Sequence, residues 1–148
     1  MSADPPIVSF RRAGTGLPRA ELRAFAAALL SEVAGGRHFE CLLTDDRELH
    51  RLNREFLGED YPTDVLSFPS GTAGGFAGEM AISVGRAKAQ SAEFGHTVSE
   101  EIKILMLHGV LHLLGMDHEN DRGAMARTEK RWRKHFSLPA SLTERIRA

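Results

Sequence analysis

The sequence contains little cysteine and no long apolar run, and each absence removes a class of protein. Cys41 is the single cysteine among 148 residues, which excludes an internal disulfide framework and a cysteine-rich zinc module. No apolar stretch approaches the roughly 20 residues that a membrane span needs. The first ten residues, MSADPPIVSF, lack the basic stretch and apolar stretch of a signal peptide. We therefore expect a cytoplasmic protein with no membrane partner.

A strong excess of charge of one sign is also missing, because the formal net charge is only −1. The chain as a whole is therefore not a general binder of nucleic acid. The charges are nevertheless unevenly distributed: residues 40–65 hold eight acidic and three basic side chains, whereas residues 119–148 hold eight basic and four acidic ones. The basic segment is either a surface that faces RNA or a solvated helix face.

Length and composition predict a single domain that spans residues 1–148. The hydrophobic fraction of 42% and the charged fraction of 26% are near the averages of globular proteins. Apolar runs predict strands over residues 7–10, 39–43, 65–68 and 80–84. Helical periodicity and capping residues predict helices over residues 18–34, 86–94, 97–115 and 123–136, and a further helix that starts at Asp45. Strands and helices do not alternate strictly, so we expect an α+β fold in which helices pack on a small mixed sheet.

The helix predicted over residues 97–115 is apolar almost all round, which is typical of a buried central helix. It carries His108 and His112. Four residues turn an α-helix by about 400°, so these two imidazoles project from one face, about one turn apart. Two nitrogens placed in this way can both reach one zinc ion at about 2.0–2.1 Å.

A third histidine, His118, follows after a glycine. On a continuing helix it would lie roughly 120° away from the face of the first pair. Gly115 removes this difficulty, because glycine adopts the left-handed conformation that ends helices and reverses the chain. The sequence therefore predicts a zincin-like metal-binding helix with one Zn²⁺ held by His108, His112 and His118. Three neutral imidazoles and an open position are typical of a catalytic zinc site.

The spacing of the histidines matches the metzincin protease pattern, with one difference. The metzincin catalytic glutamate follows the first histidine, and here that position is Gly109. Glycine cannot accept a proton, so a conventional zinc peptidase would lack its general base. We consider Asp117, Glu119 and Glu79 as candidate bases. The two acids that flank the third histidine are more typical of residues that orient a ligand.

Three stretches of the sequence occur in the order found in one known family: PTDVLSFP at residues 62–69, GEMAIS at 78–83 and HGVLHLLGMDHE at 108–119. The last resembles the His-Gly-x-Leu-His-Leu-x-Gly-x-Asp-His motif of the YbeY family. The other two are similar to the family's Pro-Thr-Asp/Asn-Val-Leu-Ser-Phe-Pro and Gly-Asp-Ile-x-Ile-Ser blocks. The resemblance spans about residues 39–136.

This resemblance implies a zinc-dependent endoribonuclease, specific for single-stranded RNA, that matures the 3′ end of small-subunit ribosomal RNA and acts in ribosome quality control. It implies that His108, His112 and His118 are the zinc ligands. It also implies ribosomal RNA, the small ribosomal subunit and ribosome-assembly proteins as partners. The family's usual arginine in a Tyr-Arg-Gly context is replaced here by Leu57, and we hypothesise that Arg54, on roughly the same helix face, partly substitutes.

Basic residues of the predicted last helix are further candidates for RNA phosphate contacts, namely Arg127, Lys130 and Arg131. Glu129 lies among the inward-facing positions of the same helix. We favour a satisfied core residue for Glu129, with a partner of the metal site as the other interpretation. The remaining histidines are interpreted as surface or capping residues: His38, His50, His96 and His135.

Two other functions remain open from the sequence. A zinc peptidase of the metzincin type would cleave peptides and would need a carboxylate base close to the metal. A non-catalytic ribosome-assembly factor would use zinc as a structural staple and would bind through the basic carboxyl-terminal region.

Overall fold

The computed structural model describes residues 6–13, 16–58, 63–71, 74–117 and 121–147. The predicted metal ligand His118 and the candidate base Glu119 lie outside these residues. The elements follow the order β1 (Ile7–Phe10), α1 (Arg19–Ala28), η1 (Leu29–Val33), β2 (His38–Thr44), α2 (Asp46–Leu57), β3 (Val65–Pro69), β4 (Phe76–Ser83), α3 (Val84–Phe94), α4 (Val98–Leu113), α5 (Ala124–His135) and α6 (Leu142–Arg147).

The four strands form one mixed sheet in the order β1-β2-β4-β3. Strands β1, β2 and β4 run parallel, whereas β3 pairs antiparallel with β4 and forms an edge. The register places Met80 of β4 beside Cys41 of β2 and Ser67 of β3. The predicted α+β class and the mixed sheet are therefore confirmed.

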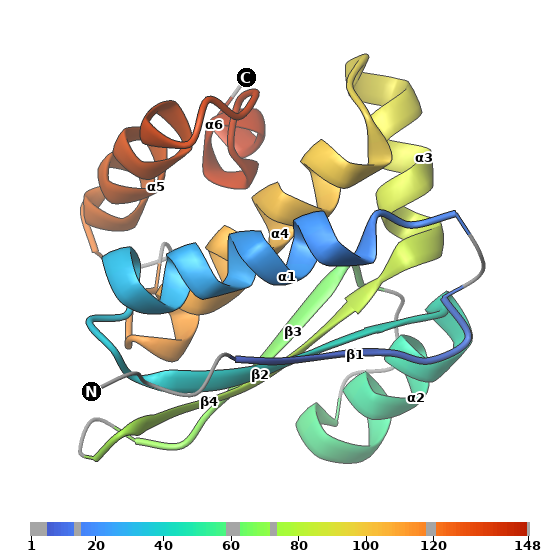
Figure 1. Ribbon diagram of the computed structural model, residues 1–148, viewed down its shortest axis with the longest axis horizontal. Coiled ribbons are helices and arrows are strands. Elements are labelled where there is room, and N and C mark those ends of the chain that lie inside the picture. Colours follow the sequence, from blue (N-terminus) through green and yellow to red (C-terminus); the bar gives the residue numbers. More distant parts are fainter. Residues whose placement is uncertain (1–5, 14–15, 59–62, 72–73, 118–120, 148) are drawn as a thin grey trace.

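Helices cover the two faces of the sheet unequally, as Figure 1 shows. Helices α1 and α4 lie across one face, with α5 and α6 beyond them, whereas α2 lies on the other. Helix α4 packs on β3 and β4, and most of its side chains are buried. It is the predicted central helix, and its burial explains why its apolar residues surround the whole helix.

Capping side chains begin the helices α2, α3 and α4. Asp45 accepts a hydrogen bond from the Glu48 backbone N–H at 2.8 Å and so starts α2. Thr97 and Glu100 form a reciprocal capping box at the start of α4, with backbone donor distances of 3.0 and 2.9 Å. Ser83 caps α3, which therefore begins two residues before the predicted start at Arg86.

Several details differ from the sequence prediction. The helix expected over residues 18–34 changes into the π-helix η1, in which the Ala34 backbone N–H donates to the Leu29 carbonyl at 2.8 Å. Strand β4 begins four residues earlier than expected, because its first residues also pair with β2 and β3. Helix α6 was not predicted. Phe56 of α2 is 65% exposed, and its ring meets that of Phe68 edge to face with centroids 6.0 Å apart.

Among the described residues, no helix is both long and apolar enough to cross a bilayer. Cys41 is 1% exposed in β2, and burial raises the pKa of its thiol to about 12. A thiol with this pKa is not a nucleophile at neutral pH, so Cys41 is a small core residue.

An ion pair between Glu144 of α6 and Arg133 of α5 attaches the two helices to each other. The Arg133 guanidinium donates to both carboxylate oxygens, at 2.8 and 2.9 Å, and lowers the pKa of Glu144 from 4.5 to about 2 despite partial burial. The stabilising contribution is therefore present above pH 4.5 and is lost as the pH falls toward about 2.

We expect Glu144→Gln to lower the free energy of unfolding by about 1 kcal/mol at pH 7 and by much less near pH 2.5. Urea denaturation of both proteins at the two pH values measures this difference. Glu93→Gln, on the exposed surface of α3, is the control and should change little at either pH. An equal loss at both pH values for Glu144→Gln would contradict the role of this ion pair.

Candidate metal centre

The carboxyl-terminal half of α4 brings two imidazoles together. The Nε2 atoms of His108 and His112 lie 3.0 Å apart, and their rings meet edge to face with centroids 4.6 Å apart. His108 is buried and His112 is half-buried. The predicted convergence of this pair on one helix face is confirmed.

The two histidines fit a common metal ion. Two nitrogens bound tetrahedrally to one zinc at about 2.0–2.1 Å lie roughly 3.3 Å apart, so the pair needs only a small adjustment. His108 Nδ1 faces a carboxylate and therefore carries the proton, which leaves the Nε2 lone pair directed toward His112. An imidazole oriented by a carboxylate through its second nitrogen is the usual arrangement of a metal-binding histidine.

That carboxylate belongs to Glu129 of α5, which is 0% exposed. Its Oε2 lies 2.6 Å from His108 Nδ1, and its Oε1 accepts hydrogen bonds from the backbone N–H and the hydroxyl of Thr143, both at 2.9 Å. Burial alone would raise the pKa of Glu129, but the hydrogen bond with His108, together with the Thr143 donors, holds this pKa below its usual value.

On sequence alone, Glu129 was favoured as a satisfied core residue. Its contact with His108 supports the other interpretation, in which Glu129 is a partner of the candidate metal site. Sequence spacing alone does not select it, because the contact joins residues of two different helices, α4 and α5.

The chain reverses after α4 as the glycine predicts. Gly115 has φ +94°, the Gly115 N–H donates to the His112 carbonyl at 2.9 Å, and the Met116 N–H donates to the Leu111 carbonyl at 3.1 Å. These two bonds are those of a Schellman motif. Within the described part of the chain, no three His, Cys, Asp or Glu side chains are arranged to hold an ion. The role of His118 as third ligand therefore stays a prediction.

Gly109, which stands where metzincins carry their glutamate, faces the sheet. A Cβ atom there would lie 2.8 Å from Met80 Sδ and 3.4 Å from Ser67 Oγ. The Ser67 hydroxyl also donates to the Gly109 carbonyl at 3.3 Å. A side chain at this position would enter the contact between α4 and the strands β3 and β4, so the position could not present a base.

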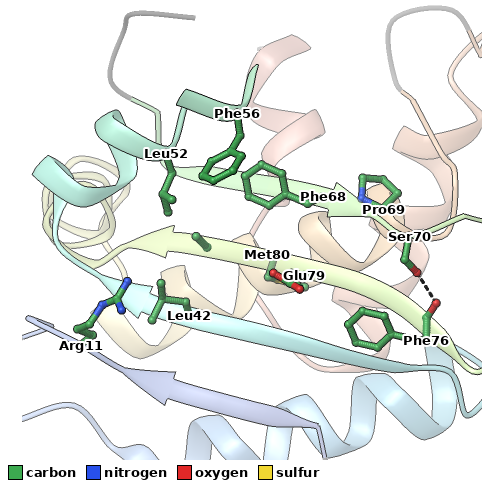
Figure 2. Close-up of a pocket in the computed structure, with 11 residues that line it drawn as sticks. Arg11, Leu42, Leu52, Phe56, Phe68, Pro69, Ser70, Phe76, Glu79 and Met80 are labelled. Carbon is green, nitrogen blue, oxygen red and sulfur yellow. Dashed lines mark hydrogen bonds between the residues drawn. The ribbon is translucent and has the colours of Figure 1, made fainter. Parts of the chain in front are cut away.

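The other candidate bases are differently placed. Glu79 alternates with Met80 along β4, so its side chain points to the sheet face opposite α4. Glu79 lines an open groove with a volume of about 510 Å³. Figure 2 shows its side chain between those of Leu42 and Phe68, on the face that α2 partly covers. This geometry argues against Glu79 as the base. Asp117 is exposed at the start of the segment that leads to His118.

The candidate RNA-binding residues do not form one surface. Arg54 is exposed on α2, where it lines a shallow hollow with Asp46, Arg47, His50 and Arg51. The exposed side chains of Arg127, Lys130 and Arg131 lie on α5, on the opposite side of the sheet (Figure 1). Any RNA contacted by both groups would have to pass around the sheet.

His96 was interpreted as a surface or capping residue, and this was wrong. Its side chain is 7% exposed, and its Nε2 lies 2.6 Å from Glu101 Oε1, which is fully buried on α4. Arg145 of α6 donates to the other oxygen of Glu101 from both terminal nitrogens, each at 3.1 Å. The buried Glu101 carboxylate needs these two partners, which lie in the turn before α4 and on α6.

The fold and this site define an α+β protein in which a helix bearing paired histidines lies on a mixed sheet and is backed by a carboxylate. A family profile described as "Endoribonuclease YbeY" matches residues 15–137. The chain therefore belongs to the YbeY family of endoribonucleases, as the sequence motifs imply.

Curated relatives agree with this assignment. A protein of Solibacter usitatus described as "Endoribonuclease YbeY" is 59% identical, over 95% of this chain and 95% of its own. Another of Nautilia profundicola with the same description is 47% identical, over 74% of this chain and 79% of its own. A Thermotoga maritima protein whose structure was determined in solution superposes with a TM-score of 0.58 at 27% identity, covering 90% of this chain and 95% of that one.

The contact at Gly109 can be tested by adding one methyl group. Gly109→Ala should lower the free energy of unfolding by about 1 kcal/mol, because overpacking against Met80 exceeds the gain in helix propensity. Chemical denaturation measures the loss. In a Met80→Ala background the same substitution should be neutral or stabilising, because the clash is removed. An equal loss in both backgrounds would show that the contact is not responsible.

Proposed function

We propose that this protein is a zinc-dependent endoribonuclease specific for single-stranded RNA. The observation that carries the proposal is the convergence of His108 and His112, with Glu129 orienting His108 from behind. Membership in the YbeY family supports an RNA substrate. One zinc ion would be held by His108, His112 and His118.

The chain's own residues prepare this site. Glu129 fixes the tautomer of His108 and directs its Nε2 outward, and the Gly115 reversal leads the chain back from the end of α4. A bound ion would supply Lewis acidity toward a phosphodiester and would activate water for its hydrolysis. Ligation by histidines alone leaves the full charge of the ion, which suits an anionic substrate. Asp117 and Glu119 are the acids that we propose as base or as orienting partners.

We further infer that the substrate is ribosomal RNA, cleaved during maturation of the 3′ end of the small-subunit RNA and in ribosome quality control, in the cytoplasm. The partners would be the small ribosomal subunit and ribosome-assembly proteins. Exposed Arg127, Lys130 and Arg131 on α5 provide positive charge for phosphates on one side of the sheet. Arg54 on α2 provides positive charge on the other side of the sheet.

The structure weakens the peptidase alternative, since the position of the metzincin glutamate faces Met80 and Ser67 rather than solvent. The non-catalytic assembly factor makes a different prediction, because it would bind RNA without metal-dependent turnover. The two functions are therefore separated by one assay of cleavage.

His112→Ala tests the metal centre. We expect the variant to stay folded, to lose its roughly one equivalent of zinc, and to cleave single-stranded RNA at least about 100-fold more slowly, because a direct ligand matters more than an outer-shell partner. Metal analysis and cleavage assays of the apo and re-metallated proteins measure these effects. His135→Ala is the matched control, an exposed histidine of α5 paired with Glu32.

Three results would contradict the proposed zinc-dependent nuclease activity. Cleavage that survives both chelation and the loss of His112 would exclude a metal mechanism. RNA binding without turnover by the zinc-loaded protein would indicate an assembly factor. Digestion of casein with no effect on RNA would indicate a peptidase.

Leu57 stands where the family usually has an arginine, and Arg54 is proposed to take over the role of that arginine. The variant Arg54→Glu tests this proposal. We expect KM for single-stranded RNA to rise severalfold and the salt dependence of binding to become shallower, because one phosphate contact is lost. Arg19→Glu makes the same change of charge at an exposed position of α1 and is the control. Unchanged cleavage by Arg54→Glu would disprove the substitution.

A further inference from the structure

Helix α6 lies beyond the residues that the family profile matches, which end at residue 137. It nevertheless contacts both helices of the candidate metal centre. Three consecutive residues of α6 each bind a different side chain: Thr143 binds Glu129, Glu144 binds Arg133, and Arg145 binds Glu101. These contacts fix the position of α6 along α5 and across α4.

Thr143 is the member of this series that reaches the metal centre. It is 3% exposed, and both its backbone N–H and its hydroxyl donate to Glu129 Oε1 at 2.9 Å. The other oxygen of the same carboxylate lies 2.6 Å from His108 Nδ1. A continuous chain of hydrogen bonds therefore runs from α6 through Glu129 to the histidine.

A carboxylate has two equivalent oxygens and can rotate between its partners. With Oε1 saturated by two donors, the plane of the Glu129 carboxylate is fixed and Oε2 is left for His108. Removal of the Thr143 hydroxyl would leave one donor on Oε1, so the carboxylate could turn and the imidazole would lose its single orientation. Orienting partners of this kind change metal affinity when they are mutated.

We propose that Thr143 is a positioning residue of the metal centre, which holds the Glu129 carboxylate so that His108 presents Nε2 to the ion. The inference rests on the metal site proposed above. It adds that a segment outside the family match takes part in building this site.

Zinc affinity of the full-length protein, measured by competition with a chromophoric chelator, tests this role. Thr143→Val removes the hydroxyl at nearly constant volume and should weaken zinc binding roughly threefold to tenfold, less than the roughly 10- to 100-fold expected for Glu129→Gln. Thr143→Ala should give the same loss, and Thr143→Ser, which restores the hydroxyl, should bind within twofold of the wild type. The visible spectrum of the cobalt-substituted protein should change in Thr143→Val and not in Thr143→Ser.

Ser141→Ala is the matched control, because it removes a buried hydroxyl of the same segment that donates to Glu144 at 3.0 Å and makes no bond to Glu129. The Ser141 hydroxyl lies 3.4 Å from that of Thr143, but the Thr143 hydroxyl donates its own hydrogen to Glu129 and keeps this bond in the control. It should lower the thermal unfolding temperature of the apo protein about as much as Thr143→Val, yet leave zinc affinity unchanged. Equal loss of zinc affinity in Ser141→Ala and Thr143→Val would reduce Thr143 to a packing role and overturn the proposal.

Unchanged zinc affinity in Thr143→Val, or failure of Thr143→Ser to restore it, would also overturn the proposal. So would unfolding of both the Val and the Ala variants, since Thr143 would then be structural. If the wild type itself binds no zinc, the proposed function and this inference fall together. If the wild type binds zinc and only the comparison of variants fails, this inference alone is lost.

Discussion

The close approach of α4 to strands β3 and β4 is the constraint on which the site depends. At Gly109 the helix has no side chain, which lets Met80 Sδ and Ser67 Oγ come near its backbone. At Gly78 the strand likewise has none: a Cβ there would lie 2.4 Å from the Phe68 carbonyl oxygen and 2.9 Å from Leu113 Cδ2. Two glycines on facing elements therefore set the distance between helix and sheet.

This contact explains why three separate sequence blocks occur together. Ser67 and Phe68 belong to PTDVLSFP, Gly78 and Met80 to GEMAIS, and Gly109 to the histidine stretch. Each block supplies one surface of the same junction, so none of the three can vary freely without disturbing the others. The glycine after His108 is thus required by packing, and the missing metzincin glutamate follows from the geometry of the fold.

Local sequence signals predicted much of this architecture, because they act over short distances. The spacing of His108 and His112 gives their shared face from helix geometry alone, and Asp45 and Thr97 mark helix starts by the hydrogen bonds they accept. Gly115 similarly indicates the end of α4. Such features need no knowledge of the rest of the chain.

The features that were missed depend on contacts between distant residues. The role of Glu129 depends on its contact with His108, which forms only when α5 packs on α4. The burial of His96 likewise depends on its contact with the buried Glu101, which the sequence does not reveal. Helix α6 is short and rich in charge, so it has no apolar periodicity to reveal it. Its position is set by ion pairs and by Thr143, which are tertiary contacts.

The carboxyl-terminal region contributes hydrogen-bond donors to two buried carboxylates, one on α4 and one packed against it. Helix α4 is nearly all apolar, yet Glu101 near its start is fully buried, as is Glu129 against its end. A buried carboxylate is tolerated only with several donors or a nearby positive charge. For Glu101 these come from His96 and Arg145, and for Glu129 from His108 and Thr143. One short helix, α6, thus supplies donors to both, which is why the histidine-bearing helix has a defined orientation at each end.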